Sequence, residues 1–112
     1  KTTSASGNVA TYIYCGDDSV TPVSGRILLY QNGKQIKEKK IENIETGVGG
    51  DVYSYTQVDW RNLEGSMEEY QLKAEITDNY GRVYSSEFFH ITKRPRSVIF
   101  CYFLGVNVAA RT

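Results

Sequence analysis

Few residues of this chain are of a type and spacing that could support catalysis. His90 is the only histidine, and nucleophilic catalysis requires such a base beside a serine or cysteine. It lies in a strand-like segment, and the chain contains no Gly-x-Ser-x-Gly motif. Adjacent carboxylates such as Glu68 and Glu69 point to opposite faces of a strand, so they do not flank a substrate. The sequence therefore predicts no catalytic residues and no enzyme.

Metal ligands are equally sparse. Asp17, Asp18 and Asp78 lie in predicted loops, and calcium prefers oxygen ligands from such loops. Aspartate in a turn is also explained by hydrogen bonds between its side chain and the backbone. Cys15 and Cys101 are not part of a Cys-x-x-Cys pair, which argues against zinc. We therefore expect no metal and no cofactor, while the two cysteines could form one disulfide or remain two buried thiols.

Aromatic side chains offer one possible binding surface. Tyr53 and Tyr55 alternate along a strand-like segment that ends at Trp60. If Trp60 faces the core, the two tyrosines face outward, where sugar rings could stack on them. Outward tyrosines are also explained by coverage of a sheet or by contact with a neighbouring domain. Tyr53, Tyr55 and Trp60 are the ligand-binding candidates, with a polysaccharide as the ligand.

Composition describes one β-rich domain. The 112 residues include nine tyrosines, and aromatic side chains suit a half-buried pleated sheet. Thirteen acidic and thirteen basic residues balance to zero net charge, which argues against nucleic-acid binding and against a basic membrane anchor. The apolar segment 97–112 follows the basic run 93–96 and is too short to span a bilayer. The chain begins at Lys1 without a signal-peptide pattern, and we interpret it as a fragment of a longer protein.

The pair Asn32-Gly33 predicts a β-hairpin, because it separates two strand-like runs and a type I′ turn needs positive φ at both central residues. This turn would place Tyr30 opposite Gln35 and Leu29 opposite Ile36. We expect three apolar residues of the hairpin to share the inward face, namely Ile27, Leu29 and Ile36.

The most regular alternation begins at Tyr70, with Tyr70, Leu72, Ala74 and Ile76 predicted to point inward. The turn 78–81 ends in Gly81, and RVYSSEFFHI is predicted to return as the next strand. Strands at regular spacing with short polar turns predict an all-β, antiparallel sandwich of about seven strands.

Two long segments resemble bacterial immunoglobulin-like accessory domains. The first is VATYIYCGDDSVTPVSGRILLYQNGKQI, which runs from an alternating strand to an apolar strand ending in Asn-Gly-Lys. The second is YSYTQVDWRNLEGSMEEYQLKAEITDNYGRVYSS, and together the two span about residues 9–91. The antibody-type cysteine pattern is absent, because Leu72 stands two residues after Tyr70. The resemblance implies an Ig-like, fibronectin-III-like sandwich without catalytic residues.

Tyr70 fits a tyrosine corner, in which the ring enters the core and the hydroxyl bonds to the backbone near 63–65. An ordinary tyrosine at the edge of the core is the alternative. The resemblance leaves the usual first strand unaccounted for, because the preceding KTTSASGN is a poor strand sequence. We hypothesise that residues 97–104 take the place of that strand or pair with a neighbouring molecule.

These observations together predict an Ig-like domain over residues 1–96, with 97–112 as an extra strand or tail. The resemblance implies a non-catalytic spacer or adhesion module of a larger extracellular, cell-surface or virion protein. Its partners would be neighbouring domains of the same chain or another protein, and a carbohydrate-binding module using the tyrosine face is the alternative. Tyr70, Asn32, Gly33 and Gly81 are expected to serve the fold.

Overall fold

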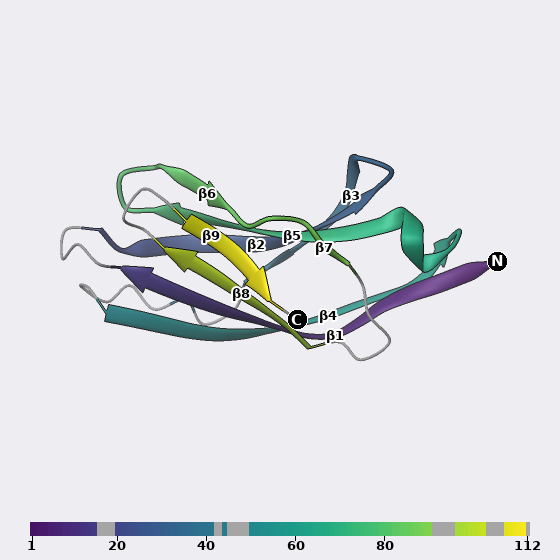
Figure 1. Cartoon of the computed structure of the whole chain (residues 1–112), viewed down its shortest axis with the longest axis horizontal. Coiled ribbons are helices and arrows are strands. Elements are labelled where there is room, and N and C mark those ends of the chain that lie inside the picture. The colour runs from purple at the N-terminus through teal and green to yellow at the C-terminus, as the bar shows by residue number, and fades with distance from the viewer. Residues whose placement is uncertain (16–19, 42–43, 45–49, 91–95, 103–106, 112) are drawn as a thin grey trace.

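The computed structural model is a β-sandwich of two sheets (Figure 1). It describes residues 1–15, 20–41, 44, 50–90, 96–102 and 107–111. For residues 10, 12, 14, 15, 50–53, 55, 96–102 and 107–111 it describes the backbone alone. The strands are β1 (Thr2–Cys15), β2 (Pro22–Gln31), β3 (Lys34–Lys40), β4 (Gly50–Glu64), β5 (Tyr70–Asp78), β6 (Val83–Ser85), β7 (Phe89–His90), β8 (Arg96–Tyr102) and β9 (Asn107–Arg111), with a 3₁₀ turn η1 (Met67–Glu69) before β5.

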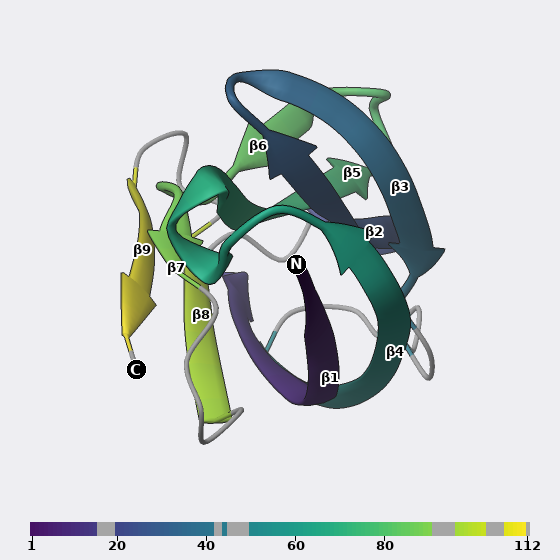
Figure 2. The same cartoon turned by 90° about the vertical axis from the view of Figure 1, so that its right-hand side faces the viewer.

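The two sheets have different strand orders. Sheet A has the order β4-β1-β8-β9, and sheet B has the order β3-β2-β5-β6 with β7 also paired to β5. All described pairs are antiparallel except β1 with β8, which run parallel. Figure 2, seen along the long axis, shows β2, β3, β5 and β6 on one side and β1 and β4 on the other. The prediction of an all-β sandwich of two mainly antiparallel sheets is confirmed.

The β1–β4 ribbon gives the molecule its length, with principal extents of 48 × 22 × 19 Å. Its register runs from Thr2 opposite Glu64 to Cys15 opposite Gly50. The prediction that KTTSASGN is a poor strand is wrong, because residues 2–8 form the first half of β1. The long partner strand β4 supplies their backbone hydrogen bonds, and Ala5 is buried against the core despite the polar sequence around it.

The core lies between the sheets and follows the predicted alternation. Along β5, every second residue is buried, from Tyr70 at one end to Asp78 at the other, and the intervening residues are half-buried. Side chains from β1 and β4 meet these residues from the opposite sheet. Burial of such apolar surface is the main favourable term in folding. The core includes Val9, Ile13, Val20, Ile27, Leu29, Ile41, Val58, Leu63, Tyr70, Leu72, Ala74, Ile76 and Phe89.

The predicted β2–β3 hairpin forms, with a correction to its register. Asn32 and Gly33 have φ of 50° and 83°, and Tyr30 pairs with Gln35 as predicted. Leu29, however, pairs with Lys37 because a bulge in β3 inserts one residue. Ile36 is that extra residue and is 38% exposed, so the prediction that it faces the core is wrong.

The predicted strand 82–91 is interrupted. It forms two short strands, β6 and β7, which both pair with β5. Between them, Ser86 bonds Ala74 twice: its N–H donates to the Ala74 carbonyl and its hydroxyl accepts from the Ala74 N–H, both at 2.8 Å. The side-chain hydroxyl therefore replaces a backbone acceptor, which lets the chain bend without leaving a buried N–H unpaired.

The C-terminal strands complete sheet A. β8 lies beside β1, on the side opposite to β4, and β9 pairs with β8. Cys101 is the register partner of Ile13, so Cys15 is its diagonal neighbour. The side chains of both cysteines lie outside the described part, and so does the choice between one disulfide and two thiols. None of the described helical residues forms a segment long and apolar enough to cross a membrane.

Candidate functional site

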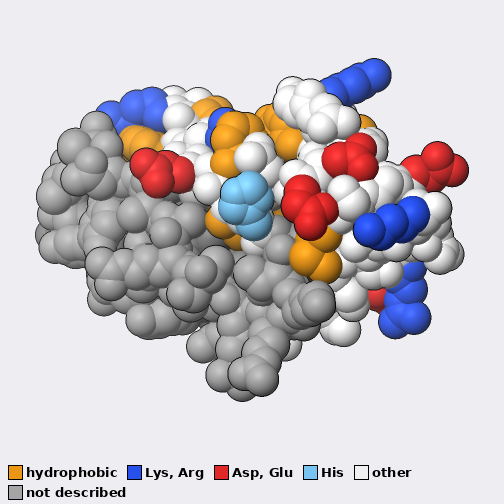
Figure 3. Space-filling view, turned by 45° about the vertical axis from the view of Figure 1, so that its right-hand side comes forward, with side chains coloured by type: hydrophobic (Ala, Val, Ile, Leu, Met, Phe, Trp, Pro, Cys, Tyr) orange, Lys and Arg blue, Asp and Glu red, His pale blue; other side chains and the backbone are white. Residues whose placement is uncertain are grey.

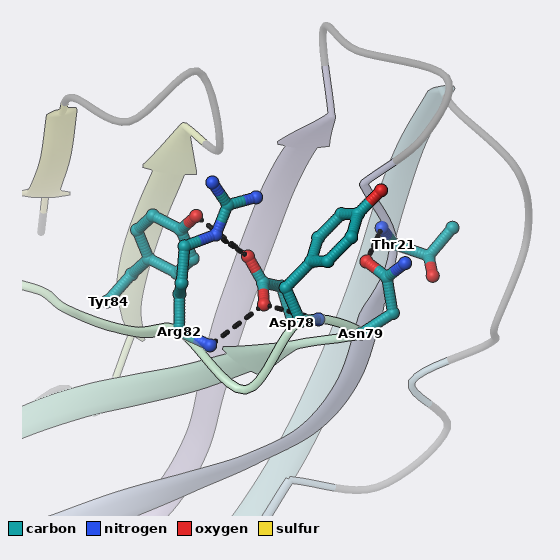
Figure 4. Close-up of polar contacts among 6 residues, drawn as sticks. Thr21, Asp78, Asn79, Arg82 and Tyr84 are labelled. Carbon is teal, nitrogen blue, oxygen red and sulfur yellow. Dashed lines mark hydrogen bonds and ion pairs between the residues drawn. The ribbon is translucent and has the colours of Figure 1, made fainter.

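Asp78 is the centre of the densest polar cluster, shown in Figure 4. It is the last residue of β5 and is 1% exposed. Its Oδ1 accepts from the N–H groups of Tyr80 at 2.8 Å and Arg82 at 2.9 Å. Its Oδ2 accepts from Arg82 Nε at 2.7 Å and from the Tyr84 hydroxyl at 2.8 Å. Four donors therefore surround one buried carboxylate and hold the β5–β6 turn.

Hydrogen bonding dominates the electrostatics of this carboxylate. Burial by itself raises the pKa of Asp78, since it disfavours the charged form. The backbone N–H of Arg82, the hydroxyl of Tyr84 and the Arg82 guanidinium outweigh burial, so the pKa lies below its usual range. Asp78 is consequently ionised at neutral pH, and both of its carboxylate oxygens accept hydrogen bonds from the protein.

This arrangement bears on the calcium hypothesis. The oxygens of Asp78 already accept from protein donors, so the residue is explained as a turn-forming aspartate. Asp17 and Asp18 lie outside the described residues. Within the described ranges, no group of three or more His, Cys, Asp and Glu side chains could hold a metal ion.

A second polar cluster lies at the opposite end of β5, around Glu69. Its carboxylate accepts from the Ser66 N–H at 2.7 Å, and the Asn32 N–H donates to its carbonyl at 3.0 Å. The side chains of Gln31 and Asn32 also reach its Oε1, each at 3.4 Å. The Ser66 N–H lowers the pKa of Glu69, burial opposes this, and the two amides add to the lowering. Glu69 thereby fastens the β2–β3 hairpin to the connection between β4 and β5.

Tyr70 lies next to this cluster and is 1% exposed. Its hydroxyl donates to the carbonyl of Glu64, inside the segment named for the tyrosine corner. Gln31 Nε2 donates to the same carbonyl at 3.1 Å. Since Glu64 ends β4 and the other two residues lie in sheet B, these bonds join the two sheets.

A polar groove lies where the edge strands β3 and β4 face each other. It has a volume of about 450 Å³ and is lined by Lys39, Gln57, Asp59 and Trp60. Trp60 is partly buried and packs against the core, as expected for the inward face of β4. Lys39 is opposite Ile27 and so lies on the core side of edge strand β3. The groove thus combines one indole with charged and amide groups.

The other ligand-binding candidates are placed only through the backbone. Tyr53 pairs with Tyr12 and Tyr55 pairs with Ala10 in the β1–β4 ribbon. The side chains of Tyr53 and Tyr55 lie outside the described part, and with them the prediction that both face outward. His90 is exposed at the end of β7, where it pairs with Gln71.

The outer face of sheet B carries an ion-pair network. Arg26 binds Glu38 at 3.0 Å and Glu75 at 2.8 Å, and these two bonds raise the pKa of Arg26. The Lys73 Nζ lies over the ring of Phe88, 5.0 Å from its centroid. The Tyr30 ring meets the Phe88 ring edge-on, with 5.0 Å between the two ring centroids. Figure 3 shows hydrophobic side chains among charged ones over the upper part of the molecule, where Figure 1 places sheet B.

Sequence reasoning missed the roles of Glu69, Arg82 and Ser86. Only Glu69 had a local signal, because Ser66-Met67-Glu68-Glu69 has the Ser-x-x-Glu spacing of a capping box. The clusters around Asp78 and Glu69 hold turns and strand ends in place, and the groove at Trp60 offers an aromatic ring beside charged and amide groups.

No family model, no curated protein and no solved structure matches this chain.

Proposed function

We propose that this chain is a non-catalytic Ig-like structural or interaction module, a spacer or adhesion domain, of a larger extracellular or virion protein. Strand order supports the Ig-like part. β1 pairs with β4 in one sheet, while β2 pairs with β5 and β5 with β6 in the other, as the B–E and C–F–G strands of Ig domains do. Tyr70, at the start of β5, occupies the place of an Ig tyrosine corner. β8 lies beside β1, where strand A would be, but runs parallel to it.

One observation carries the mechanical part of the proposal: β5 is tied down by polar contacts at both of its ends. At its start, Tyr70 and Gln31 bind the end of β4. At its end, Asn79 and Thr21 exchange two hydrogen bonds of 2.9 Å, and Asp78 holds the following turn. The contacts at the start of β5 resist separation of the two sheets, and those at its end resist unravelling of sheet B, which together are the properties a spacer requires.

Force spectroscopy tests the proposal. The whole chain would be placed in tandem between reference domains and stretched. We expect one cooperative unfolding event, releasing a chain whose extended length is roughly 370–400 Å for 112 residues. Glu69→Gln should lower the unfolding force, because it weakens the bonds between the hairpin and the β4–β5 connection. Gradual extension at low force would contradict a mechanical role.

A carbohydrate-binding module is the second candidate, and the groove at Trp60 is the observation that favours it. An aromatic ring beside Gln57, Asp59 and Lys39 combines stacking surface with donors and acceptors, as sugar hydroxyls require. A glycan array with the whole chain tests this. Gln57→Ala should abolish any binding that uses the groove, whereas Gln35→Ala, at another exposed glutamine, in β3, should not. An array without binding, or binding insensitive to Gln57→Ala, would remove this candidate.

A further inference from the structure

Two large apolar side chains at the tip of the β5–β6 hairpin are exposed, on either side of an exposed arginine. Tyr80 is 61% exposed and Val83 is 57% exposed. The Arg82 side chain between them is 54% exposed. We call these three residues the hairpin tip. Tyrosine and arginine are the residue types that, with tryptophan, most often dominate binding energy at protein interfaces.

The hairpin tip is held rigidly. Asp78 fixes the N–H groups of Tyr80 and Arg82, and its own N–H donates to the Arg82 carbonyl at 3.0 Å. Asn79 is bonded in both directions to Thr21 in the neighbouring segment. Gly81 has a φ of 81°, which the turn requires. A surface fixed in this way loses little conformational entropy when a partner binds.

Arg82 offers donors that the fold does not use. Its Nε donates to Asp78, and Figure 4 shows the two terminal nitrogens pointing away from that carboxylate. Among the described residues, none accepts a hydrogen bond from these terminal nitrogens. The guanidinium carbon lies 5.0 Å from the centroid of the Tyr80 ring. The planar cation is thus oriented by an anion on one side and by an aromatic ring on another.

Competing surfaces are less suited to docking. The Phe88 ring on the outer face of sheet B is already contacted by Tyr30 and Lys73. The edge of β3 carries four lysines, and lysine at a sheet edge discourages added strands. The hairpin tip combines exposed apolar surface with a partly unused, oriented cation.

We propose that the hairpin tip docks a partner protein that presents a carboxylate beside an apolar side chain. The carboxylate would accept two hydrogen bonds from the terminal nitrogens of Arg82, a geometry that guanidinium favours. The apolar side chain would pack on Tyr80 and Val83. This inference rests on the proposed interaction module and specifies which surface it uses and the chemistry of its partner.

Selection of random linear peptides displayed on phage against the whole chain tests the inference. The selected peptides should share an acidic residue next to a large apolar one. Tyr80→Ala should weaken their binding at least tenfold, and this variant should fold normally, because the Tyr80 side chain is 61% exposed and does not belong to the buried core. Arg82→Lys should weaken binding similarly, since it keeps the charge but loses the planar fork.

Lys34→Gln is the matched control, because it removes one positive charge from the other hairpin and should leave binding unchanged. Peptides that lack acidic residues, or that bind Tyr80→Ala as tightly as the original chain, would overturn the hairpin tip as the docking surface. Failure to select any peptide would overturn it as well. These outcomes leave the force measurement unaffected, so loss of the docking surface is distinguishable from loss of the proposed module function.

Discussion

The hydroxyl of Tyr70 donates a hydrogen bond to the carbonyl of Glu64, six residues earlier in the chain. Tyr70 begins β5 in sheet B and Glu64 ends β4 in sheet A, so this bond helps to hold the two sheets together where the chain crosses between them. The ring is buried while its hydroxyl reaches a backbone acceptor, which suits an amphipathic side chain at the edge of a core.

Tyr70→Phe should lower the free energy of unfolding by about 1 kcal/mol, because one buried hydrogen bond is lost and packing is kept. The Glu64 carbonyl retains Gln31 Nε2 as a donor, which limits the loss. Urea unfolding followed by fluorescence would measure it. Tyr30→Phe, on the half-buried outer face of sheet B, is the control and should change stability much less. Equal effects of the two variants would argue against a special role for the corner.

Gly65→Ala should be more damaging than Gly81→Ala. Both glycines have positive φ, 98° and 81°, where an L-residue costs roughly 1–2 kcal/mol. A Cβ at Gly81 meets nothing within 4 Å, whereas at Gly65 it overlaps the carboxylate of Glu69. That carboxylate is held by Ser66 and cannot move away without losing its hydrogen bonds. Thermal unfolding of both variants would measure the difference, and a smaller loss at Gly65 would contradict the argument.

Asp78 should make stability depend on acid pH. Its pKa in the folded chain lies below the ordinary value of 3.8, because hydrogen bonds outweigh the opposing effect of burial. A carboxyl with a depressed folded-state pKa stabilises the fold fully above its unfolded-state pKa. That contribution is lost as the pH falls from the unfolded-state value through the lower folded-state value.

Asp78→Asn should therefore lose roughly 2–3 kcal/mol at neutral pH and show a shallower decline below about pH 4. Denaturant unfolding at a series of pH values would show both effects. Glu87→Gln, which removes an exposed carboxylate between β6 and β7, should keep the steep decline. Parallel pH profiles for Asp78→Asn and the original chain would contradict the assignment.

Thr11→Val should raise stability by about 1 kcal/mol. Thr11 is 0% exposed, and within the described part of the chain its Oγ1 has no hydrogen-bond partner. Valine has nearly the same shape and removes a desolvated hydroxyl. Thr77→Val on the half-buried outer face of β5 is the control and should have little effect. A destabilised Thr11→Val variant, measured by calorimetry, would indicate that the hydroxyl has a partner.

Local sequence signals predicted some elements well. The alternation after Tyr70 predicted which side chains of β5 are buried, because strand geometry repeats every two residues regardless of context. Asn32-Gly33 predicted the hairpin, because few other residue pairs tolerate positive φ at both positions. The pairing of Leu29 was mispredicted, since a bulge at Ile36 carries no clear local signature.

The candidate sites show more plainly what the sequence could not predict. The inward position of Trp60 follows from alternation along β4, but the groove beside it also needs Lys39 from another sheet. Asp78 was recognised as a turn residue, whereas its contacts with Arg82 and Tyr84 depend on the path of the following strand.

By itself, the sequence determined the β-rich class, the hairpin at Asn32-Gly33 and the buried face of β5. These features depend on backbone conformation and residue spacing, which are local. Only the tertiary structure decided that KTTSASGN forms a strand, that β8 runs parallel to β1, and that Asp78 and Glu69 hold the two ends of β5. Each of these features is stabilised by partners distant in sequence, and the free energy of such pairings exists only once the chain has folded.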